Sequence, residues 1–542
     1  MNLISLVGLL AILGLAWAMS YHRRDIRYRT VAWGLGLQFV FAVIILREDF
    51  WSYVGMVLLG GLIAVYQLRP GEDEEANWAR LGGQLAAVVA LAAACFFLVR
   101  DVIGWIVVAV LALIIVNSRL RLVPAMVRSL MGPLLIALGI SWMIVNGFYG
   151  QDGFRVLTSK VSGFLNLSDF GAQFLFGTLA DVGVVMDPAN QGLPGFGAVF
   201  AFKVLPTIVF FGGFMAVLYY LGIMQKVIIG LSGFVRWTIG TSGAETLSCT
   251  ANVFVGQTEA PLLIKPFLNT MTTSELLTVM VGGFATIAGG VLAGYIAMGV
   301  PASHLIAASV MSAPAALLIG KMIYPEKEVS QTAGELKEMP EIDSGSNVIE
   351  AATNGITDGL KLAVNVGAML LGFIALMAVV DITLNFADSL IDGRMLGGEH
   401  VEYGGGGLSP VTGEFVGYFP GSLRTLFGTL LSPLAFLMGV PWVDATKVGN
   451  LLGIKLSLNE FVSYGTLGSY IQNGALSERA VIISTYALCG FANFSSIGIQ
   501  IGGISALAPG RKSELARVGL RAMLGGALAS WLTATIAGIL LS

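Results

Sequence analysis

Long apolar runs separated by short polar stretches make up most of this chain. Runs long enough, or nearly long enough, to cross a bilayer lie at about 2–20, 31–46, 52–68, 82–99, 103–118, 129–147, 197–222, 275–298, 303–323, 361–384, 477–500 and 513–541. Each run is expected to be helical, because a helix bonds its own backbone polar groups inside lipid. The pattern therefore predicts an all-α polytopic membrane protein with about twelve spans.

The charges of the loops predict an orientation, because Lys and Arg accumulate in cytoplasmic loops. "HRRDIRYR" (22–29) and "GRKSELAR" (510–517) are basic, whereas "RED" (47–49) holds one arginine matched by acids. This alternation places both termini outside a cytoplasmic (inner) membrane. The first apolar run lacks a positive segment before it, and arginines follow it instead, so we interpret it as a retained span and not a signal peptide.

Two segments do not fit the series of simple spans. "SGAETLSCTANVFVGQTEAPLLIKPFL" (about 242–268) and "KVGNLLGIKLSLNEFVSYGTLGSY" (about 447–470) mix apolar residues with Glu, Lys, Asn and Thr. Each would enter and leave on one side of the membrane, as a re-entrant hairpin does where it lines a cavity. Each is followed by a span interrupted by polar and glycine residues, at 282–295 and at 489–503. This arrangement, repeated in opposite orientations, predicts an inverted repeat with interrupted transmembrane helices, as in secondary transporters.

The same pattern predicts the domain organisation. We expect N-terminal helices over 1–50, additional transmembrane helices over 51–148, a first core half over 149–323, a cytoplasmic loop over 324–350 and a second core half over 351–542. The first half holds the hairpin at about 242–268 and the second the hairpin at about 447–470.

Composition agrees with a membrane protein and excludes several functions. The 542 residues are 56% hydrophobic and 12% charged, against roughly 25% charged in soluble domains. The net charge of −3 offers no basic surface for nucleic acid. Cys95, Cys249 and Cys489, and His22, His304 and His400, have no spacing typical of disulfide frameworks or zinc sites, so we expect no cofactor.

Three motifs carry a resemblance to a known family. "GQTEAPL" (256–262), "GIKLSLNEFVSY" (453–464) and "GFANFSSIGIQ" (490–500) resemble, in order and spacing, hallmark stretches of the concentrative nucleoside transporters. The resemblance covers about 1–46 and 149–542, and it departs at Ser463, where the family usually has alanine, and at the added segment 51–148. It implies a homotrimeric symporter, not an enzyme, that imports nucleosides with sodium by alternating access.

Two carboxylates lie inside the predicted hairpins. A carboxylate at the centre of a span costs about 2.5–3.5 kcal/mol, so Glu259 and Glu460 should either face a wet cavity or pair with Lys265 and Lys455. Gln257, Thr258 and Glu259 supply neighbouring donors and acceptors, as the edge of a nucleobase requires.

The resemblance assigns roles to these residues. It implies that Glu460, Asn493 and Ser496 hold the ribose, and that Gln257, Thr258 and Glu259 hold the base. Val291 and Phe491 would contact the ring, although ordinary helix packing also explains them. The sodium ion would bind the carbonyls of Asn252, Val255 and Ile287 with the side chains of Thr258 and Thr286, since hard cations prefer oxygen ligands.

Three alternatives stay open from the sequence. The first is the same symporter driven by protons. The second is an intramembrane serine protease, because "GTSG" (240–243) surrounds Ser242, and His304 is its candidate base. The third is a nucleoside-gated channel or receptor, because re-entrant hairpins also line selectivity filters.

Overall fold

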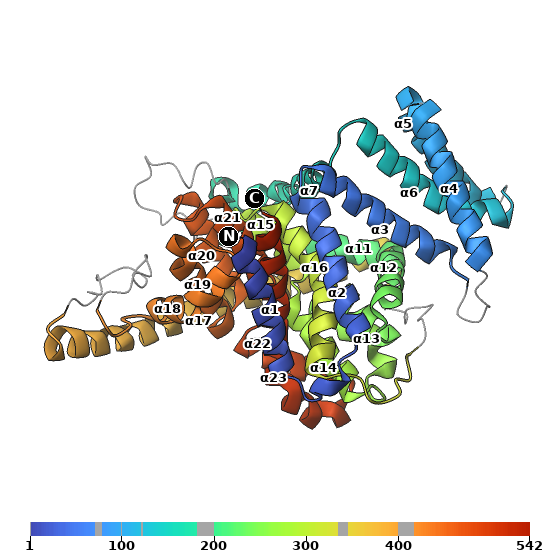
Figure 1. The fold of residues 1–542 in the computed structure, drawn as a ribbon. Coiled ribbons are helices and arrows are strands. Elements are labelled where there is room, and N and C mark those ends of the chain that lie inside the picture. Colours follow the sequence, from blue (N-terminus) through green and yellow to red (C-terminus); the bar gives the residue numbers. More distant parts are fainter. Residues whose placement is uncertain are drawn as a thin grey trace. The chain divides into compact units, whose positions relative to one another are not determined.

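The computed structural model describes residues 2–70, 78–98, 100–120, 123–180, 200–333, 345–398 and 417–541, and all regular elements within them are helices. His400 and residues 334–344 of the predicted cytoplasmic loop lie outside these ranges. The chain forms two compact units, one of residues 1–38 with 158–542 and one of residues 39–157. The predicted all-α fold is confirmed in both (Figure 1).

The smaller unit contains the helices of the added segment. Its helices, including two that cross its boundaries, are α2 (Tyr28–Leu46), α3 (Phe50–Leu68), α4 (Trp78–Leu98), η2 (Arg100–Val102), α5 (Ile103–Leu120), α6 (Ala125–Val145) and α7 (Gly150–Leu165). Within this unit α6 contacts α3, α4 and α5.

The larger unit contains the rest of the described chain. Its N-terminal half holds α1 (Asn2–Ala18), η1 (Arg23–Asp25), α8 (Ser168–Phe176), η3 (Gly177–Ala180), η4 (Phe200–Val204), α11 (Leu205–Tyr220), α12 (Ile223–Ile239), α13 (Gly243–Ala251), η5 (Ala260–Phe267), α14 (Thr273–Ala285), α15 (Gly289–Ala297) and α16 (Ala302–Ile323). Its C-terminal half holds α17 (Val348–Asp388), η6 (Ser389–Met395), α18 (Leu423–Leu437), α19 (Trp442–Ser457), α20 (Glu460–Gln472), α21 (Glu478–Leu488), α22 (Phe494–Leu507), η7 (Pro509–Arg511) and α23 (Lys512–Leu540).

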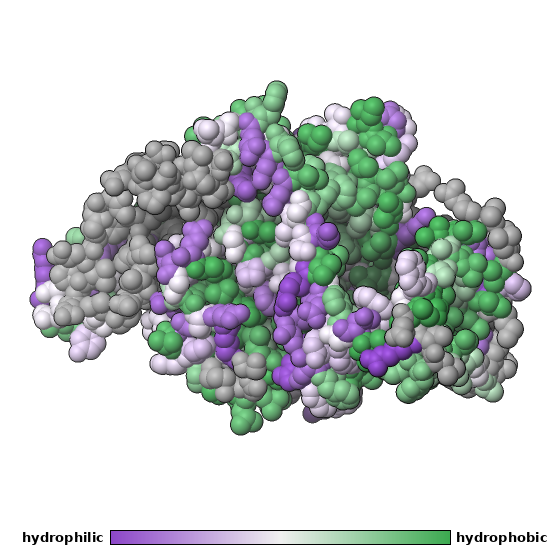
Figure 2. Space-filling model, turned by 90° about the horizontal axis from the view of Figure 1, so that it is seen from above, coloured by the Kyte–Doolittle hydropathy of each residue, from purple (hydrophilic) through white to green (hydrophobic). Residues whose placement is uncertain are grey.

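Seven helical stretches of the described chain are long and apolar enough to cross a membrane, and an eighth is possible if α18 and α19, bent by 118°, form one broken span. The seven are Tyr28–Leu46, Phe50–Leu68, Val127–Val145, Ala201–Tyr220, Thr273–Ala297, Ala302–Ile323 and Pro509–Leu540. They number fewer than the predicted runs because some runs form shorter helices and others are divided, as 477–500 is between α21 and α22. Apolar side chains also cover much of the surface seen in Figure 2. These observations confirm a polytopic membrane protein.

The core of the larger unit is built from α14, α16 and α23, which contact one another and lie side by side with α1 in Figure 1. Small residues allow this close packing. A Cβ on Gly320 of α16 would lie 2.9 Å from Thr278 Oγ1 of α14, and one on Gly525 of α23 would lie 2.8 Å from Ile323 of α16. These packed helices fix the ends of the broken helices that lead to the site.

Two helices break at the same place in the core. Helix α14 ends at Ala285 and α15 begins at Gly289, while α21 ends at Leu488 and α22 begins at Phe494. The breaks contact each other, because Phe491 N donates to Thr286 O at 3.3 Å. Gly490 has a φ of +133°, and a Cβ there would lie 2.5 Å from Phe284 O. Only glycine fits both this backbone conformation and this space.

The two predicted hairpin segments each form a pair of helical arms in contact. In the first, α13 is followed by a turn over 252–259 and by η5. In the second, α19 and α20 are separated only at Leu458 and Asn459, and α19 begins at Trp442, before the predicted start at about 447. The Asn459 side chain caps α20 by accepting from Val462 N at 2.9 Å.

Candidate functional site

A cavity of about 180 Å³ in the larger unit brings together all eight residues predicted to bind base and ribose. It lies between the turn of the first hairpin, the start of α20, the two helix breaks and α17. Its lining residues are Gly256, Gln257, Thr258, Glu259, Ala288, Val291, Leu362, Val366, Asn459, Glu460, Phe461, Phe491, Asn493, Ser495, Ser496 and Ile499. Segments more than two hundred residues apart thus meet around one space.

Glu460 is the buried carboxylate of this cavity. It is the first residue of α20, its side chain is 4% exposed, and its two oxygens have different partners. Tyr295 Oη donates to Oε1 at 3.2 Å, and Asn493 Nδ2 donates to Oε2 at 3.2 Å. A carboxylate has about four acceptor positions, so two more donors can bind here.

The lysines that were expected as alternative partners do not pair with the two glutamates. Lys455 Nζ donates to Ala487 O and to Ser530 Oγ, both at 2.9 Å, and no ion pair with Glu460 occurs in the described chain. Lys265 is exposed, and it likewise makes no ion pair with Glu259 within the described ranges. Lys455 does not pair with Glu460 because α19 ends between the two residues. The lysine side chain instead points toward α21 and α23. Glu460 therefore faces the cavity without a direct ion pair to any described residue.

A chain of polar side chains continues from Glu460 along α22 to the first hairpin. Asn493 caps α22 by accepting from Ser496 N at 2.9 Å. Gln257 Nε2 donates to Ser496 Oγ at 3.4 Å, and Gln500 Nε2 donates to Gln257 Oε1 at 3.0 Å. The residues assigned to ribose and those assigned to base are thus linked by hydrogen bonds.

Tyr295 and Gln500 are members of this chain that were not predicted from the sequence. Tyr295 is fully buried in α15, with its ring 4.3 Å from that of Tyr464 and 4.8 Å from that of Phe461. Nothing in its local sequence indicates a polar role. Gln500 carried a usable signal, because Asn493, Ser496 and Gln500 are spaced three and seven residues apart, on one helix face.

The remaining predicted contacts differ in exposure. Val291 is buried on α15 and Phe491 is half-buried at the break before α22, so both present apolar atoms to the cavity. Thr258 is half-buried and Glu259 is exposed. Glu259, Gly256, Ala288 and Leu362 also line a second cavity of about 380 Å³ between the hairpin, α11 and α17. The smaller cavity therefore adjoins a larger one on the side of Glu259.

The five residues predicted to bind sodium lie in two non-helical stretches, 252–258 and 286–287, which are joined where Gly289 N donates to Phe254 O at 3.2 Å. No donor within the described chain bonds the carbonyls of Asn252, Val255 or Ile287. Thr286 Oγ1 donates to Gly282 O at 2.9 Å, which leaves its lone pairs available. Unbonded carbonyls and a hydroxyl with free lone pairs are the kinds of oxygen ligand that a hard cation requires.

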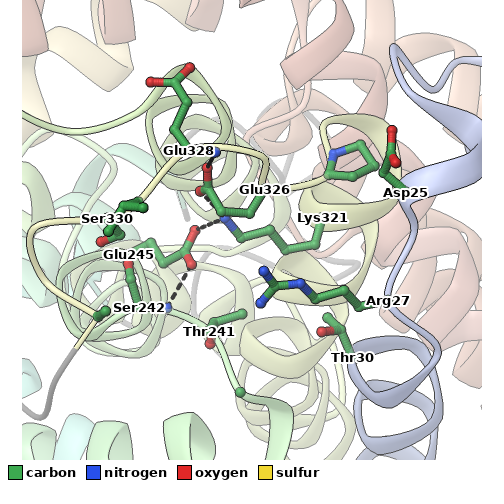
Figure 3. A pocket seen from close by; sticks show the side chains of 14 residues that line it. Asp25, Arg27, Thr30, Thr241, Ser242, Glu245, Lys321, Glu326, Glu328 and Ser330 are labelled. Carbon is green, nitrogen blue, oxygen red and sulfur yellow. Dashed lines mark hydrogen bonds and ion pairs between the residues drawn. The ribbon is translucent and has the colours of Figure 1, made fainter.

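A third cavity, of about 360 Å³, is lined by charged side chains where α2 and α13 begin and α16 ends (Figure 3). Lys321 Nζ lies 2.8 Å from Glu245 Oε2 and 3.1 Å from Glu326 Oε2. Ser242 N donates to Glu245 Oε1 at 2.8 Å, so the serine of the GTSG motif acts as the start of a helix.

His304 cannot act as a base for Ser242. It lies near the start of α16, its ring is 5.9 Å from that of Tyr486, and Lys321 lies near the end of the same helix. At 1.5 Å per residue these two positions of α16 are about 25 Å apart, and Lys321 is the one beside Ser242 and Glu245. The geometry excludes the Ser242–His304 pair that a protease would need.

Three family models match separate parts of the chain. They are described as the Na⁺-dependent nucleoside transporter N-terminus, over residues 7–60, nucleoside recognition, over 201–302, and the Na⁺-dependent nucleoside transporter C-terminus, over 304–538. The cavity takes residues from the second and third matched ranges.

Several curated relatives are similar over most of the chain. An uncharacterised transporter of Haemophilus influenzae is 41% identical over 81% of this chain and 97% of its own length. The nucleoside permease NupC of Helicobacter pylori is 39% identical over 76% of this chain and 91% of its own length. The mouse sodium/nucleoside cotransporter 1 is 42% identical over 72% of this chain and 56% of its own length.

Solved structures are similar throughout. The structure of CNTnw in an inward-facing substrate-bound state is 32% identical, with a TM-score of 0.70, and the match covers 100% of this chain and 98% of that chain. A CNTnw variant in an outward-facing state also gives a TM-score of 0.70 at 32% identity, over 99% of this chain and 97% of that chain.

Proposed function

Because this chain belongs to the concentrative nucleoside transporter family, we propose that it is a sodium-coupled symporter that imports nucleosides by alternating access. Its relatives are transporters, and it is not an enzyme. No covalent step is required, since the work is to bind a nucleoside and an ion on one side of the membrane and to release both on the other.

The observation that carries the proposal is the cavity in which Glu460 and Gln257 are linked by hydrogen bonds through Asn493 and Ser496. Vicinal ribose hydroxyls are paired donors, and Glu460 is a buried acceptor with capacity for both. Asn493 and Ser496 would complete the ribose contacts. Gln257, Thr258 and Glu259 would bind the base edge, with Val291 and Phe491 against its ring.

Sodium coupling is supported by the unbonded carbonyls of Asn252, Val255 and Ile287 beside Thr258 and Thr286. Thr258 belongs to both sets, so an ion held there would order the turn that contacts the base. One ion crossing about 100 mV releases roughly 2.3 kcal/mol, and a tenfold gradient adds about 1.4 kcal/mol. Together these suffice for an accumulation of several hundred-fold.

Uptake into proteoliposomes tests the proposal. Purified protein is reconstituted and offered radiolabelled uridine or adenosine with an inward sodium gradient, an inward proton gradient, or neither. Accumulation above the external concentration with sodium alone is the expected result. Accumulation that follows protons and ignores sodium would assign the coupling to protons, and equilibration without accumulation would indicate a channel.

Further features of the family resemblance are part of the proposal. We expect a homotrimer in the cytoplasmic membrane, with one site in each subunit and both termini outside. Residues 149–323 and 351–542 would form inverted halves in which the two hairpins move with the substrate. Cross-linking of the reconstituted protein tests the trimer, and accessibility of single introduced cysteines to an impermeant reagent tests the orientation.

A further inference from the structure

We propose that Gln500 is a positioning residue that fixes the orientation of the Gln257 side-chain amide. It thereby determines that Gln257 presents a hydrogen-bond donor, and not an acceptor, to the nucleobase. The inference rests on the proposed function and adds a determinant of base selectivity to it. Gln500 does not line the cavity, so it would act only through Gln257.

The two glutamines form a relay that ends on the backbone. Gln500 Nε2 donates to Met280 O at 3.2 Å and to Gln257 Oε1 at 3.0 Å. Gln257 Nε2 then donates to Ser496 Oγ at 3.4 Å. Both protons of the Gln500 amide are therefore in use, and its Oε1 has no partner among the residues that the structure describes.

The backbone carbonyl determines the direction of the whole relay. A carbonyl oxygen only accepts hydrogen bonds, so the group that faces Met280 O must be the NH₂ of Gln500. The same NH₂ also donates to Gln257, so Gln257 must accept this bond with its Oε1. The NH₂ of Gln257 then faces Ser496 and the cavity, with one N–H donated to Ser496 Oγ and the second available to a ligand.

The surroundings hold this arrangement in place. Gln500 is 1% exposed on α22, the helix that also carries Ser496 and is capped by Asn493. Gly283 of α14 faces both glutamines, because a Cβ there would lie 2.5 Å from Gln500 Nε2 and 3.0 Å from Gln257 Cβ. The absence of a side chain at 283 leaves the room that the relay occupies.

A fixed amide discriminates where a free one does not. An unrestrained glutamine turns its amide to offer either a donor or an acceptor, and so it serves a 4-oxo and a 4-amino pyrimidine alike. Held by Gln500, Gln257 offers a donor, which matches an oxygen or ring nitrogen of the base and opposes an amino group. The wild type should therefore take up uridine and cytidine with different kcat/KM values, and this difference should depend on Gln500.

The test measures kcat/KM for sodium-driven uptake of uridine and of cytidine by Gln500→Met, alone and in a Gln257→Ala background. The uridine-to-cytidine preference of the wild type is expected to move toward one by roughly three- to tenfold, the range of one neutral hydrogen bond. The change should appear in KM and leave kcat unaltered. In the Gln257→Ala background Gln500→Met should cause no further change in the ratio.

Gln38→Met is the matched control. Gln38 is also fully buried, its Nε2 donates to a backbone carbonyl, Gly34 O, at 3.0 Å, and its Oε1 accepts from Thr533 Oγ1 at 3.2 Å. The Gln38→Met variant loses a buried amide of the same kind, but outside the cavity. Its ratio of kcat/KM for uridine to kcat/KM for cytidine should therefore equal that of the wild type. Thermal unfolding of all variants reports the structural cost of losing a buried amide.

Several results would overturn the role of Gln500. The first is a wild-type uridine-to-cytidine ratio of one, and the second is an unchanged ratio in folded Gln500→Met. The third is a change of the ratio by Gln500→Met that is equally large in the Gln257→Ala background. If Gln500→Met does not fold, Gln500→Asn shortens the side chain by one methylene and withdraws its amide from Gln257, and an unchanged ratio there has the same meaning. Equilibrium binding of labelled uridine to purified wild type distinguishes failure of the Gln500 role from failure of the proposed function. An absence of binding would contradict the proposed function itself.

Discussion

Replacing Glu460 by glutamine exchanges one oxygen of the candidate site for an amino group. Asn493 Nδ2 can only donate, so the new amide must turn its oxygen toward Asn493 and its NH₂ toward the Tyr295 hydroxyl. The contacts with protein survive in this arrangement. The charge is lost, together with half of the acceptor positions that face the cavity.

The effect on substrate should be large and the effect on stability small. A hydrogen bond to a charged group contributes about 1.5–3 kcal/mol and a neutral one about 1 kcal/mol. Replacing the charge-assisted bonds to two ribose hydroxyls by neutral ones should therefore weaken uridine affinity by roughly 5- to 1,000-fold. Glu460 is buried without a paired cation, so removing its charge should not lower the unfolding temperature.

Competition against labelled uridine uptake measures this change. In the wild type, 2′,3′-dideoxyuridine should compete far more weakly than uridine, and in Glu460→Gln the two should compete alike. Gln257→Ala should weaken uptake less, while Glu478→Gln, which removes an exposed charge at the start of α21, should behave as wild type. Equal, mild losses at 460 and 257, or an unchanged discrimination against the dideoxy compound, would refute the ribose assignment.

Three further changes test other parts of the site. Thr286→Val removes the hydroxyl at the α14 break, so the sodium concentration for half-maximal uptake should rise roughly tenfold, the effect of about 1.4 kcal/mol, and an unaltered sodium dependence would argue against this ligand. Gly283→Ala places a Cβ 2.5 Å from Gln500 Nε2 and should raise the uridine KM and cost about 1–3 kcal/mol of stability, whereas Gly230→Ala, with open space around it, should do neither. Ser242→Ala should keep sodium-driven uptake close to wild type, because Ser242 precedes α13 beside Glu245 and lies far from His304, and loss of uptake in folded protein would contradict that interpretation.

The sequence was most informative where a polar residue interrupts an apolar run. Glu460, Asn493, Ser496 and Gln257 each cost free energy inside a span unless they face polar partners or a cavity. The structure brings these residues to one cavity, as their motifs led us to expect. The all-α fold follows from the same property, since lipid leaves the backbone few alternatives.

Partners across the fold could not be predicted in this way. Tyr295 lies 165 positions from Glu460, and Gln500 lies 243 positions from Gln257, so their contacts depend on how the helix breaks cross. Tyrosine and glutamine near an apolar span also have many ordinary explanations. The alternative of an ion pair between Lys455 and Glu460 was wrong for a related reason. Closeness in sequence does not determine where a long side chain points when a helix ends between the two residues.

The site is divided between the two halves of the core. Gln257 and Val291 come from one half, Glu460 and Asn493 come from the other, and Phe491 N and Thr286 O join the two backbones at the helix breaks. A ligand that occupies the cavity therefore acts as a non-covalent cross-link between separately matched parts of the polypeptide. Neither part expressed alone would bind it, and the two parts produced as separate polypeptides would have to associate in the membrane before either acquired affinity.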